Sequence, residues 1–269
     1  LPTHPLYQQL IKNIYFKQCY ESERVARRHA FVQYLKGLVG GILPDVLHIV
    51  DVGWKGTIQD NLFRLLCQKP SATIKAIEGY YIGLVGLGAA SHFNKKNGIL
   101  FSLVNPISYG SKVFNENKSL FEVVLAANHG STSHYIIDEL NVATPVRSHF
   151  DEVEMVERFV LPLQKQILKR FFLLHHMMVS SQKDFLAITA FHHARMVFAP
   201  SKAEMEWFSM IFHVENFGVF ENSYFNLDGQ EKRFWRRAIF TLKLATRPRR
   251  VNLGFWPWLT IYYRAGGAV

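Results

Sequence analysis

The chain has 269 residues, of which 49% are hydrophobic, and its net charge is +10. This length can bury a sizeable core. Two cysteines, Cys19 and Cys67, cannot form a disulfide framework, so we expect a reducing, cytoplasmic setting. The longest apolar stretch, at residues 80–90, is too short to span a bilayer, which needs about 20 residues. The chain begins at Leu1 rather than at Met, and we expect a piece of a longer protein with adjacent domains.

Periodicity predicts the secondary structure. The predicted elements of the first half are helices at residues 7–16, 21–38 and 57–66 and strands at 46–52, 73–84 and 98–104. Those of the second half are a helix at 120–127, a helical region at 151–199 broken near 180–181, a helix from 201, an aromatic-rich loop at 207–225 and a basic helix at 232–244. We therefore predict an α/β fold in one compact unit, with a Rossmann-like parallel sheet in residues 1–145 and a mainly helical half in residues 146–269.

The most informative stretch is residues 48–60, where a β-branched apolar run predicts a buried strand that ends at Asp51 and a glycine turn leads into a helix. In open α/β sheets, ligands bind at the carboxyl ends of buried strands. The first N–H groups of a helix lack internal partners and attract anions, and Lys55 adds a mobile cation. We therefore predict an anion site here, with a purely structural turn as an equal alternative. The predicted site residues are Asp51, Gly53, Trp54, Lys55, Gly56, Thr57 and Gln59.

A second polar cluster occupies residues 128–135. Its hydroxyls, Ser131 and Thr132, surround a glycine turn and can hold an oxyanion, while His129 can act as an acid or base near neutral pH. The alternative is an ordinary helix end at Gly130 followed by a turn. No spacing typical of metal ligands occurs in the sequence, so we expect neither a metal nor another cofactor.

The positive charge favours an anionic partner. Basic residues and large apolar residues alternate in the segment 232–250, where eight lysines and arginines follow the single acid Glu231. A solvated helix face packed on the core is the preferred interpretation, and attachment to an anionic membrane surface is the alternative. Nucleic acid is the weakest option, because no recognised binding motif accompanies the charge.

Several stretches together resemble the region downstream of the haloacid-dehalogenase-like segment in large bacterial proteins of surface-polysaccharide biosynthesis, a predicted hydrolase family that accompanies glycosyltransferase modules. The matching stretches are residues 50–59, 79–84, 120–122, 129–131, 200–204 and 217–218. The phosphatase segment itself is missing from this chain.

The resemblance implies a role in capsule or O-antigen assembly, in which the chain binds a nucleotide-activated or otherwise phosphorylated sugar. Asp51 would orient the sugar or serve as base or nucleophile, Lys55 would neutralise phosphate, and His129 and Ser131 would complete the pocket. A non-catalytic scaffold or membrane-docking module beside a phosphatase or transferase domain is the second hypothesis. Either function would place the chain in the cytoplasm or at the inner membrane.

Overall fold

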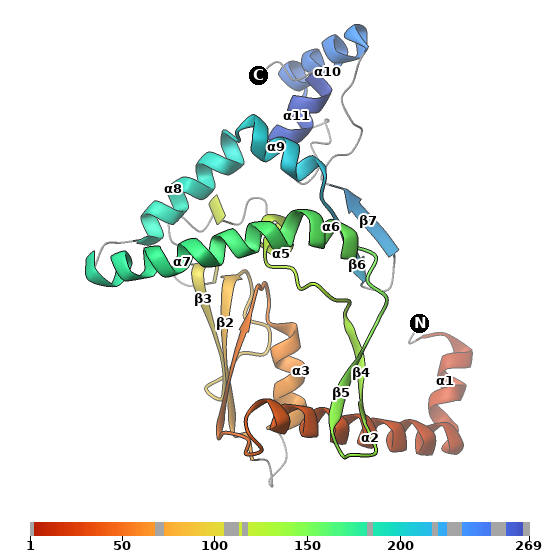
Figure 1. Cartoon of the computed structure of the whole chain (residues 1–269). Coiled ribbons are helices and arrows are strands. Elements are labelled where there is room, and N and C mark those ends of the chain that lie inside the picture. Colours follow the sequence, from red (N-terminus) through yellow and green to blue (C-terminus); the bar gives the residue numbers. More distant parts are fainter. Residues whose placement is uncertain are drawn as a thin grey trace.

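The computed structural model describes residues 3–67, 73–104, 113–114, 118–181, 185–216, 220–224, 233–248 and 257–265. A parallel sheet lies at one end of the molecule, long helices cross the middle, and two C-terminal helices lie at the opposite end (Figure 1). The first half contains α1 (Pro5–Lys12), α2 (Ile14–Leu38), β1 (Val46–Asp51), α3 (Thr57–Leu66), β2 (Ala76–Leu84), β3 (Asn94–Ser102), α5 (Ser119–Val124), β4 (Thr132–Ile137) and β5 (Ala143–Arg147). The second half contains α6 (Val153–Met155), the π-helical turn η1 (Val156–Val160), α7 (Leu161–Ser181), α8 (Phe185–Phe198), α9 (Lys202–Ser209), β6 (Phe212–Asn216), β7 (Phe220–Tyr224), α10 (Phe234–Thr246) and α11 (Pro257–Ala265).

The sheet has the order β1-β2-β3, and both strand pairs are parallel. The predicted strand–helix–strand unit is therefore confirmed, with α3 as the crossover between β1 and β2. A mixed α/β fold with a parallel sheet in the N-terminal half is the result.

The prediction that the first strand is buried is wrong, because β1 is an edge strand. Its residues alternate between exposed and half-buried, and Val50 is 79% exposed. On the face that Val50 shares, His48 stacks on Tyr80 and lies 3.8 Å from the Glu78 carboxylate. A β-branched run matches an edge strand as well as a central one, so composition alone could not separate the two.

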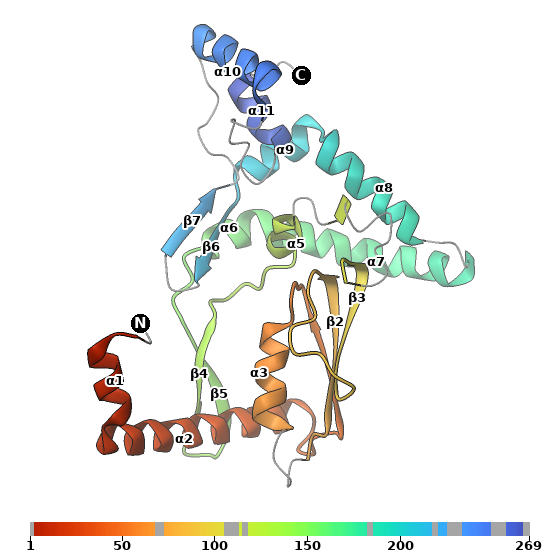
Figure 2. The ribbon, with the colours of Figure 1, turned by 180° about the vertical axis from the view of Figure 1, so that it is seen from behind.

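The other face of the sheet packs against α3 and the end of α2 (Figure 2). The buried cluster there consists of Leu43, Leu66, Ile74 and Ile77, with half-buried apolar side chains of α2 around it. The predicted boundary between the first two helices is misplaced. The break falls at Asn13, whose side-chain oxygen accepts a hydrogen bond from the Phe16 N–H and begins α2.

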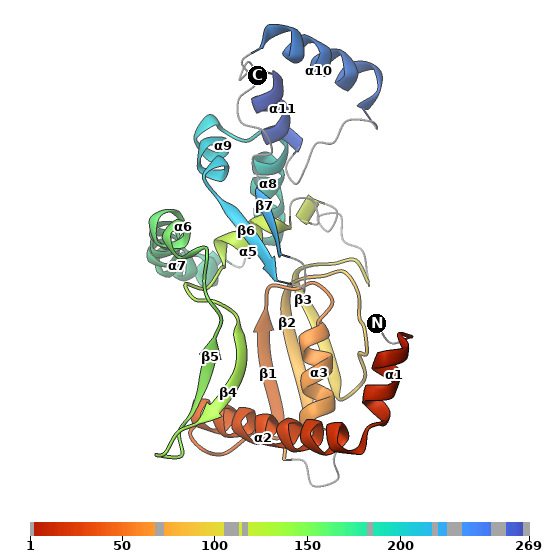
Figure 3. The ribbon, with the colours of Figure 1, turned by 90° about the vertical axis from the view of Figure 1, so that its right-hand side faces the viewer.

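Two β-hairpins replace regions that the sequence patterns assigned to other structures. The first, β4–β5, stands on α2, where Tyr135 packs against Phe31 and Tyr34 (Figure 3). The second, β6–β7, occupies part of the aromatic-rich segment expected to be a loop. The helix predicted at 120–127 ends earlier, at Val124, so Gly130 is not its cap.

A second buried core joins α5 to the helical half. Its members are Leu120, Val123, Met155, Val156, Val160, Met205, Phe208 and Ile211. The predicted break near residues 180–181 is confirmed by the end of α7, and the capping box between Ser201 and Glu204 is confirmed at the start of α9. Arg195 of α8 forms an ion pair with the same Glu204 and ties the two helices together.

The basic helix exists as α10, but its apolar face is not packed on the core. Trp235 is 76% exposed and Phe234 is 71% exposed, whereas Phe240 is buried beneath Arg264 of α11. The preferred interpretation of this segment is therefore wrong for α10. Lys232, Arg249, Arg250 and Trp256 lie outside the described residues. No helix in the described part of the chain is long and apolar enough to cross a membrane.

Candidate functional site

The turn between β1 and α3 lies at the carboxyl edge of the parallel sheet, as the sequence predicted. It is held against β2, because the Gly83 N–H donates to the Val52 carbonyl at 3.3 Å and the Val85 N–H donates to the Trp54 carbonyl at 2.7 Å. Gly56 begins α3 with φ +64°, and no side chain caps the helix. A Cβ on Gly56 would lie 2.6 Å from the Tyr81 hydroxyl, so a glycine is required.

Asp51 and Lys55 occupy this turn in different environments. The Asp51 carboxylate is half-buried and accepts hydrogen bonds from the N–H groups of Val52 and Gly53. Burial outweighs these hydrogen bonds and raises the pKa of Asp51. Lys55 and Thr57 are exposed, so both can reach a ligand in solvent. The turn therefore combines a base of raised pKa with a cation and a helix N-terminus.

A buried polar network supports the turn from below. The Gln59 side chain is fully buried, and its amide donates to the Asn94 side chain and the Lys95 carbonyl, both at 2.8 Å. The Tyr81 hydroxyl donates to the Gln59 side-chain oxygen at 2.7 Å. The expectation that Gln59 contacts substrate is therefore corrected: its side chain joins α3 to β2 and β3.

A buried ion pair between Lys96 and Asp60 completes the network. The Lys96 Nζ lies 2.8 Å from an Asp60 carboxylate oxygen, and the side chains are 0% and 9% exposed. Burial alone would raise the pKa of Asp60, but hydrogen bonds from Lys96, the Ala89 N–H and Asn94 lower it. Lys96 also donates to the Lys55 carbonyl at 2.9 Å and to the Leu87 carbonyl at 2.7 Å. One buried cation thus fixes both the β1–α3 turn and the loop after β2.

Trp54 connects the turn to α5 and, through a ring of aromatic side chains, to α8. Its indole N–H donates to the Glu122 carboxylate of α5 at 2.7 Å. The indole also belongs to a closed ring of aromatic contacts, each pair with centroids between 5.1 and 6.3 Å apart. The members of the ring, in order of contact, are Trp54, Phe101, Phe114, His193 and Phe121. These contacts fix the position of Trp54 relative to β3, α5 and α8.

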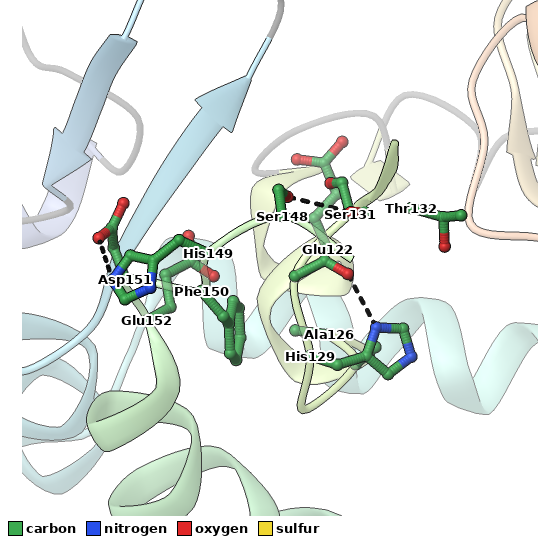
Figure 4. A pocket seen from close by; sticks show the side chains of 12 residues that line it. Glu122, Ala126, His129, Ser131, Thr132, Ser148, His149, Phe150, Asp151 and Glu152 are labelled. Atoms are coloured by element: carbon green, nitrogen blue, oxygen red, sulfur yellow. Dashed lines mark hydrogen bonds and ion pairs between the residues drawn. The ribbon is translucent and has the colours of Figure 1, made fainter. Parts of the chain in front are cut away.

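Glu122 also lines a cavity of about 310 Å³ between α5 and the hairpin β4–β5 (Figure 4). The predicted cluster lies in its wall, including His129, Ser131 and Thr132. The opposite wall is formed by residues 148–152, which contribute the carboxylates of Asp151 and Glu152. Carboxylates repel a phosphate and accept hydrogen bonds from hydroxyl groups. The cavity therefore suits a polar, uncharged group better than the oxyanion expected from the sequence.

Hydrogen bonds orient the two histidines of the cavity wall and tie down the end of α5. The His129 Nδ1 lies 3.0 Å from the Gly130 carbonyl, and because a carbonyl oxygen can only accept, Nδ1 is the donor of this hydrogen bond. The His149 Nε2 lies 3.2 Å from an Asp151 carboxylate oxygen (Figure 4). The Gln164 amide of α7 donates to the Val124 and Ala126 carbonyls at 2.9 Å and closes the end of α5.

Trp54 of the first predicted cluster and Glu122, which lines the cavity beside the second cluster, link the two clusters in the structure. Gly53, Lys55, Gly56 and Thr57 share the turn with Asp51, but none of these residues lines the cavity. The catalytic and binding roles assigned to Asp51 and His129 stay predictions. No group of three or more His, Cys, Asp or Glu side chains in the described ranges is placed to hold a metal ion.

Sequence reasoning missed the residues that support the site. Asn94 and Lys96 alternate on one face of β3, but this strand was predicted to start at Gly98. The signal in the sequence would have been a glycine-rich loop followed by an asparagine and a lysine at i, i+2 spacing, Asn94 and Lys96. Glu122 appeared only in the resemblance and without a role. No family model matches the chain, and a search of the curated proteins found no similar sequence.

Proposed function

We propose that the chain is a glycosyltransferase-like domain that binds a nucleotide-activated sugar in bacterial surface-polysaccharide assembly. In this proposal the parallel sheet is Rossmann-like and the β1–α3 turn binds the phosphates. The observation that carries the proposal is the Trp54–Glu122 hydrogen bond of 2.7 Å. It joins an anion-attracting turn to a cavity whose side chains suit a sugar.

The phosphates are assigned to the turn because of its charges. The N-terminus of α3 carries no side-chain cap, and Lys55 is exposed beside it. Fixed N–H donors stabilise a departing phosphate, which is the main catalytic contribution that such a turn can make. Asp51 is the proposed base, since burial raises its pKa and a carboxylate of raised pKa takes up a proton more readily.

The sugar is assigned to the cavity because of its hydrogen-bonding groups. Glu122 and Asp151 accept hydrogen bonds from sugar hydroxyls, and Ser131 and Thr132 can donate or accept them. In this proposal the Nδ1 of His129 is held by the Gly130 carbonyl, and its Nε2 serves as a second acceptor or base. A volume of about 310 Å³ lies at the lower end of the range for small-molecule sites.

Glycan assembly in a bacterial host tests this function. Asp51→Asn and Lys55→Ala, each introduced into the full-length protein, should abolish surface polysaccharide while the protein level stays normal. Lys75→Ala is the matched control, because Lys75 is an exposed lysine paired with Asp45 at the opposite edge of the sheet. Normal polysaccharide from both folded site variants would contradict the proposal.

A second candidate function is a module that docks on an anionic membrane through α10. The exposure of Phe234, Trp235, Ile239 and Leu242 supports it, because apolar side chains beside arginines favour the bilayer interface. Binding to anionic vesicles should weaken when Arg236, Arg237, Arg249 and Arg250 become Gln. It should also weaken as salt rises from ~0.1 M to ~1 M, which shortens the Debye length from ~10 Å to ~3 Å. Vesicle binding that stays the same after the substitutions and at high salt would exclude an electrostatic role for these arginines.

A further inference from the structure

Helices α7 and α8 form a projecting arm. Figures 1 and 2 show the two helices meeting at a tip that lies away from the rest of the chain. Every residue from 165 to 177 on α7 is exposed, and so is nearly every residue from 186 to 192 on α8. We name residues 165–177 and 186–192 the α7–α8 arm.

The exposed side chains of this arm are mainly large and apolar. Phe172 is 73% exposed, Leu173 is 68% exposed and Met177 is 63% exposed on α7, while Phe191 is 69% exposed on α8. A helix gains most of its stability by burying an apolar face, and contiguous apolar surface of this kind marks an interaction site. The arm therefore needs an apolar environment.

The charges of the arm decide which environment fits. Neither α7 nor α8 contains an Asp or a Glu. The cations Lys165, Lys169 and Arg170 come first in the exposed part of α7, the apolar run Phe171–Leu174 follows them, and two histidines and two methionines come next toward the tip. Cations at the base and apolar residues toward the tip are the arrangement that snorkelling side chains adopt at a bilayer surface.

A concavity on α7 has the size and chemistry to hold a lipid headgroup. It has a volume of about 360 Å³ and is lined by Gln166, Lys169, Arg170, Leu173 and Leu174. Two cations and an amide can bind a phosphate headgroup, and the leucines beside them can contact the start of an acyl chain.

We propose that the α7–α8 arm inserts into the interface of an anionic phospholipid bilayer. This surface is separate from α10 and from the sugar site, and the proposal does not depend on either of them. Its chemistry is burial of the phenylalanines and leucines of the arm below the headgroups, with Lys165, Lys169 and Arg170 at headgroup level.

Partitioning measurements on the full chain test the inference. The protein is sedimented with vesicles of phosphatidylcholine and phosphatidylglycerol in equal parts, and with vesicles of phosphatidylcholine alone. Phe172→Ser with Leu173→Ser should weaken partitioning at least about tenfold, because two large side chains no longer enter the interface. Leu140→Ser with Val142→Ser is the matched control on the exposed β4–β5 turn and should leave partitioning unchanged.

A probe at the arm separates its insertion from binding through α10. In a background with Cys19→Ser and Cys67→Ser, a nitrobenzoxadiazole label is attached at Phe172→Cys or at Leu140→Cys. Anionic vesicles should raise and blue-shift the emission at position 172 and not at position 140. Unchanged emission at position 172 in vesicle-bound protein would overturn the inference. A loss of self-association in the Phe172→Ser, Leu173→Ser variant with unchanged partitioning would also overturn it, in favour of a second copy of the chain.

Discussion

The indole of Trp54, in the turn after the first strand, donates its N–H to the carboxylate of Glu122 at 2.7 Å, across 68 positions of the chain. The bond joins the carboxyl edge of the sheet to the wall of the cavity. The Lys118 ammonium group lies 5.4 Å from the centre of the same indole, so the ring has a cation on its face and a carboxylate at its edge. This contact is the basis of the proposed site.

Removing the donor at Trp54 should destabilise the fold. Trp54→Phe keeps the ring contacts but leaves the Glu122 carboxylate without its partner, and we expect a loss of about 1–3 kcal/mol in the free energy of unfolding. Glu122→Gln keeps an acceptor and should cost less. Urea unfolding of both variants and of the double variant gives the coupling energy, and a coupling near zero would contradict the contact.

The buried Lys96–Asp60 pair predicts a large and specific cost. Lys96→Met leaves the Asp60 carboxylate buried without a counterion, which should lower the free energy of unfolding by about 3–5 kcal/mol. Lys95→Met is the matched control, because the neighbouring Lys95 side chain is on the exposed face and should change stability by less than about 0.5 kcal/mol. Equal effects of the two substitutions on denaturant midpoints would refute the ion pair.

Asp51 should lower the stability of the folded protein near neutral pH, although the proposed function needs it. Burial raises the pKa of Asp51, so the charged carboxylate destabilises the folded state. This cost grows as the pH rises from the pKa that Asp51 has in the unfolded chain to its higher pKa in the folded protein. Asp51→Asn should therefore raise the melting temperature near neutral pH while it abolishes activity. The gain should disappear at low pH, where the carboxyl is neutral in both states. Calorimetry at several pH values would detect it, and a lower melting temperature at neutral pH would contradict the burial argument.

Glu204 should make the helical half sensitive to acid. The Arg195 hydrogen bond, against the effect of burial, lowers the pKa of Glu204 to about 2. A lowered pKa means that this contribution to stability is present above the pKa of the unfolded chain and is lost as the pH falls toward about 2.

Glu204→Gln should remove this pH dependence and reduce stability at neutral pH by about 1–2 kcal/mol. Glu206→Gln is the control, since Glu206 lies 3.7 Å from Lys202 in an exposed pair. Acid titration of the helical circular dichroism signal distinguishes the variants. Identical acid midpoints for wild type and Glu204→Gln would show that the pair does not contribute.

Local patterns predicted the elements that carry strong signals. The bounds of α3 follow directly from the helical spacing after Gly56, and the capping box at Ser201 marks α9. The parallel pairing of β1 with β2 follows from the crossover rule. These features depend on residues close together in the chain.

Tertiary relationships could not be predicted in this way. Nothing in the alternation of β1 distinguishes an edge strand from a central one, and nothing near Trp54 in the sequence indicates a partner in α5. The hairpin β4–β5 was not predicted for a related reason. The polar residues of β4 suggested a turn, whereas their strand conformation depends on the packing of Tyr135 against α2. Asp151 and Glu152 directly precede the helix that begins at Val153, close to the predicted start of the helical region at 151, but their place in the cavity wall could not be predicted because the residues across the cavity are distant in sequence.

Calorimetric titration of the chain with nucleoside diphosphate sugars tests the central claim most directly. Wild type and Lys75→Ala should bind the same compound with equal affinity, and Lys55→Ala should bind it about tenfold more weakly or worse, because a phosphate loses its cation. Ligand at a free concentration of a hundred times its Kd should add about 2.7 kcal/mol to the free energy of unfolding. Equal binding by Lys55→Ala and Lys75→Ala, or no binding of any sugar nucleotide by the folded wild type, would contradict the account.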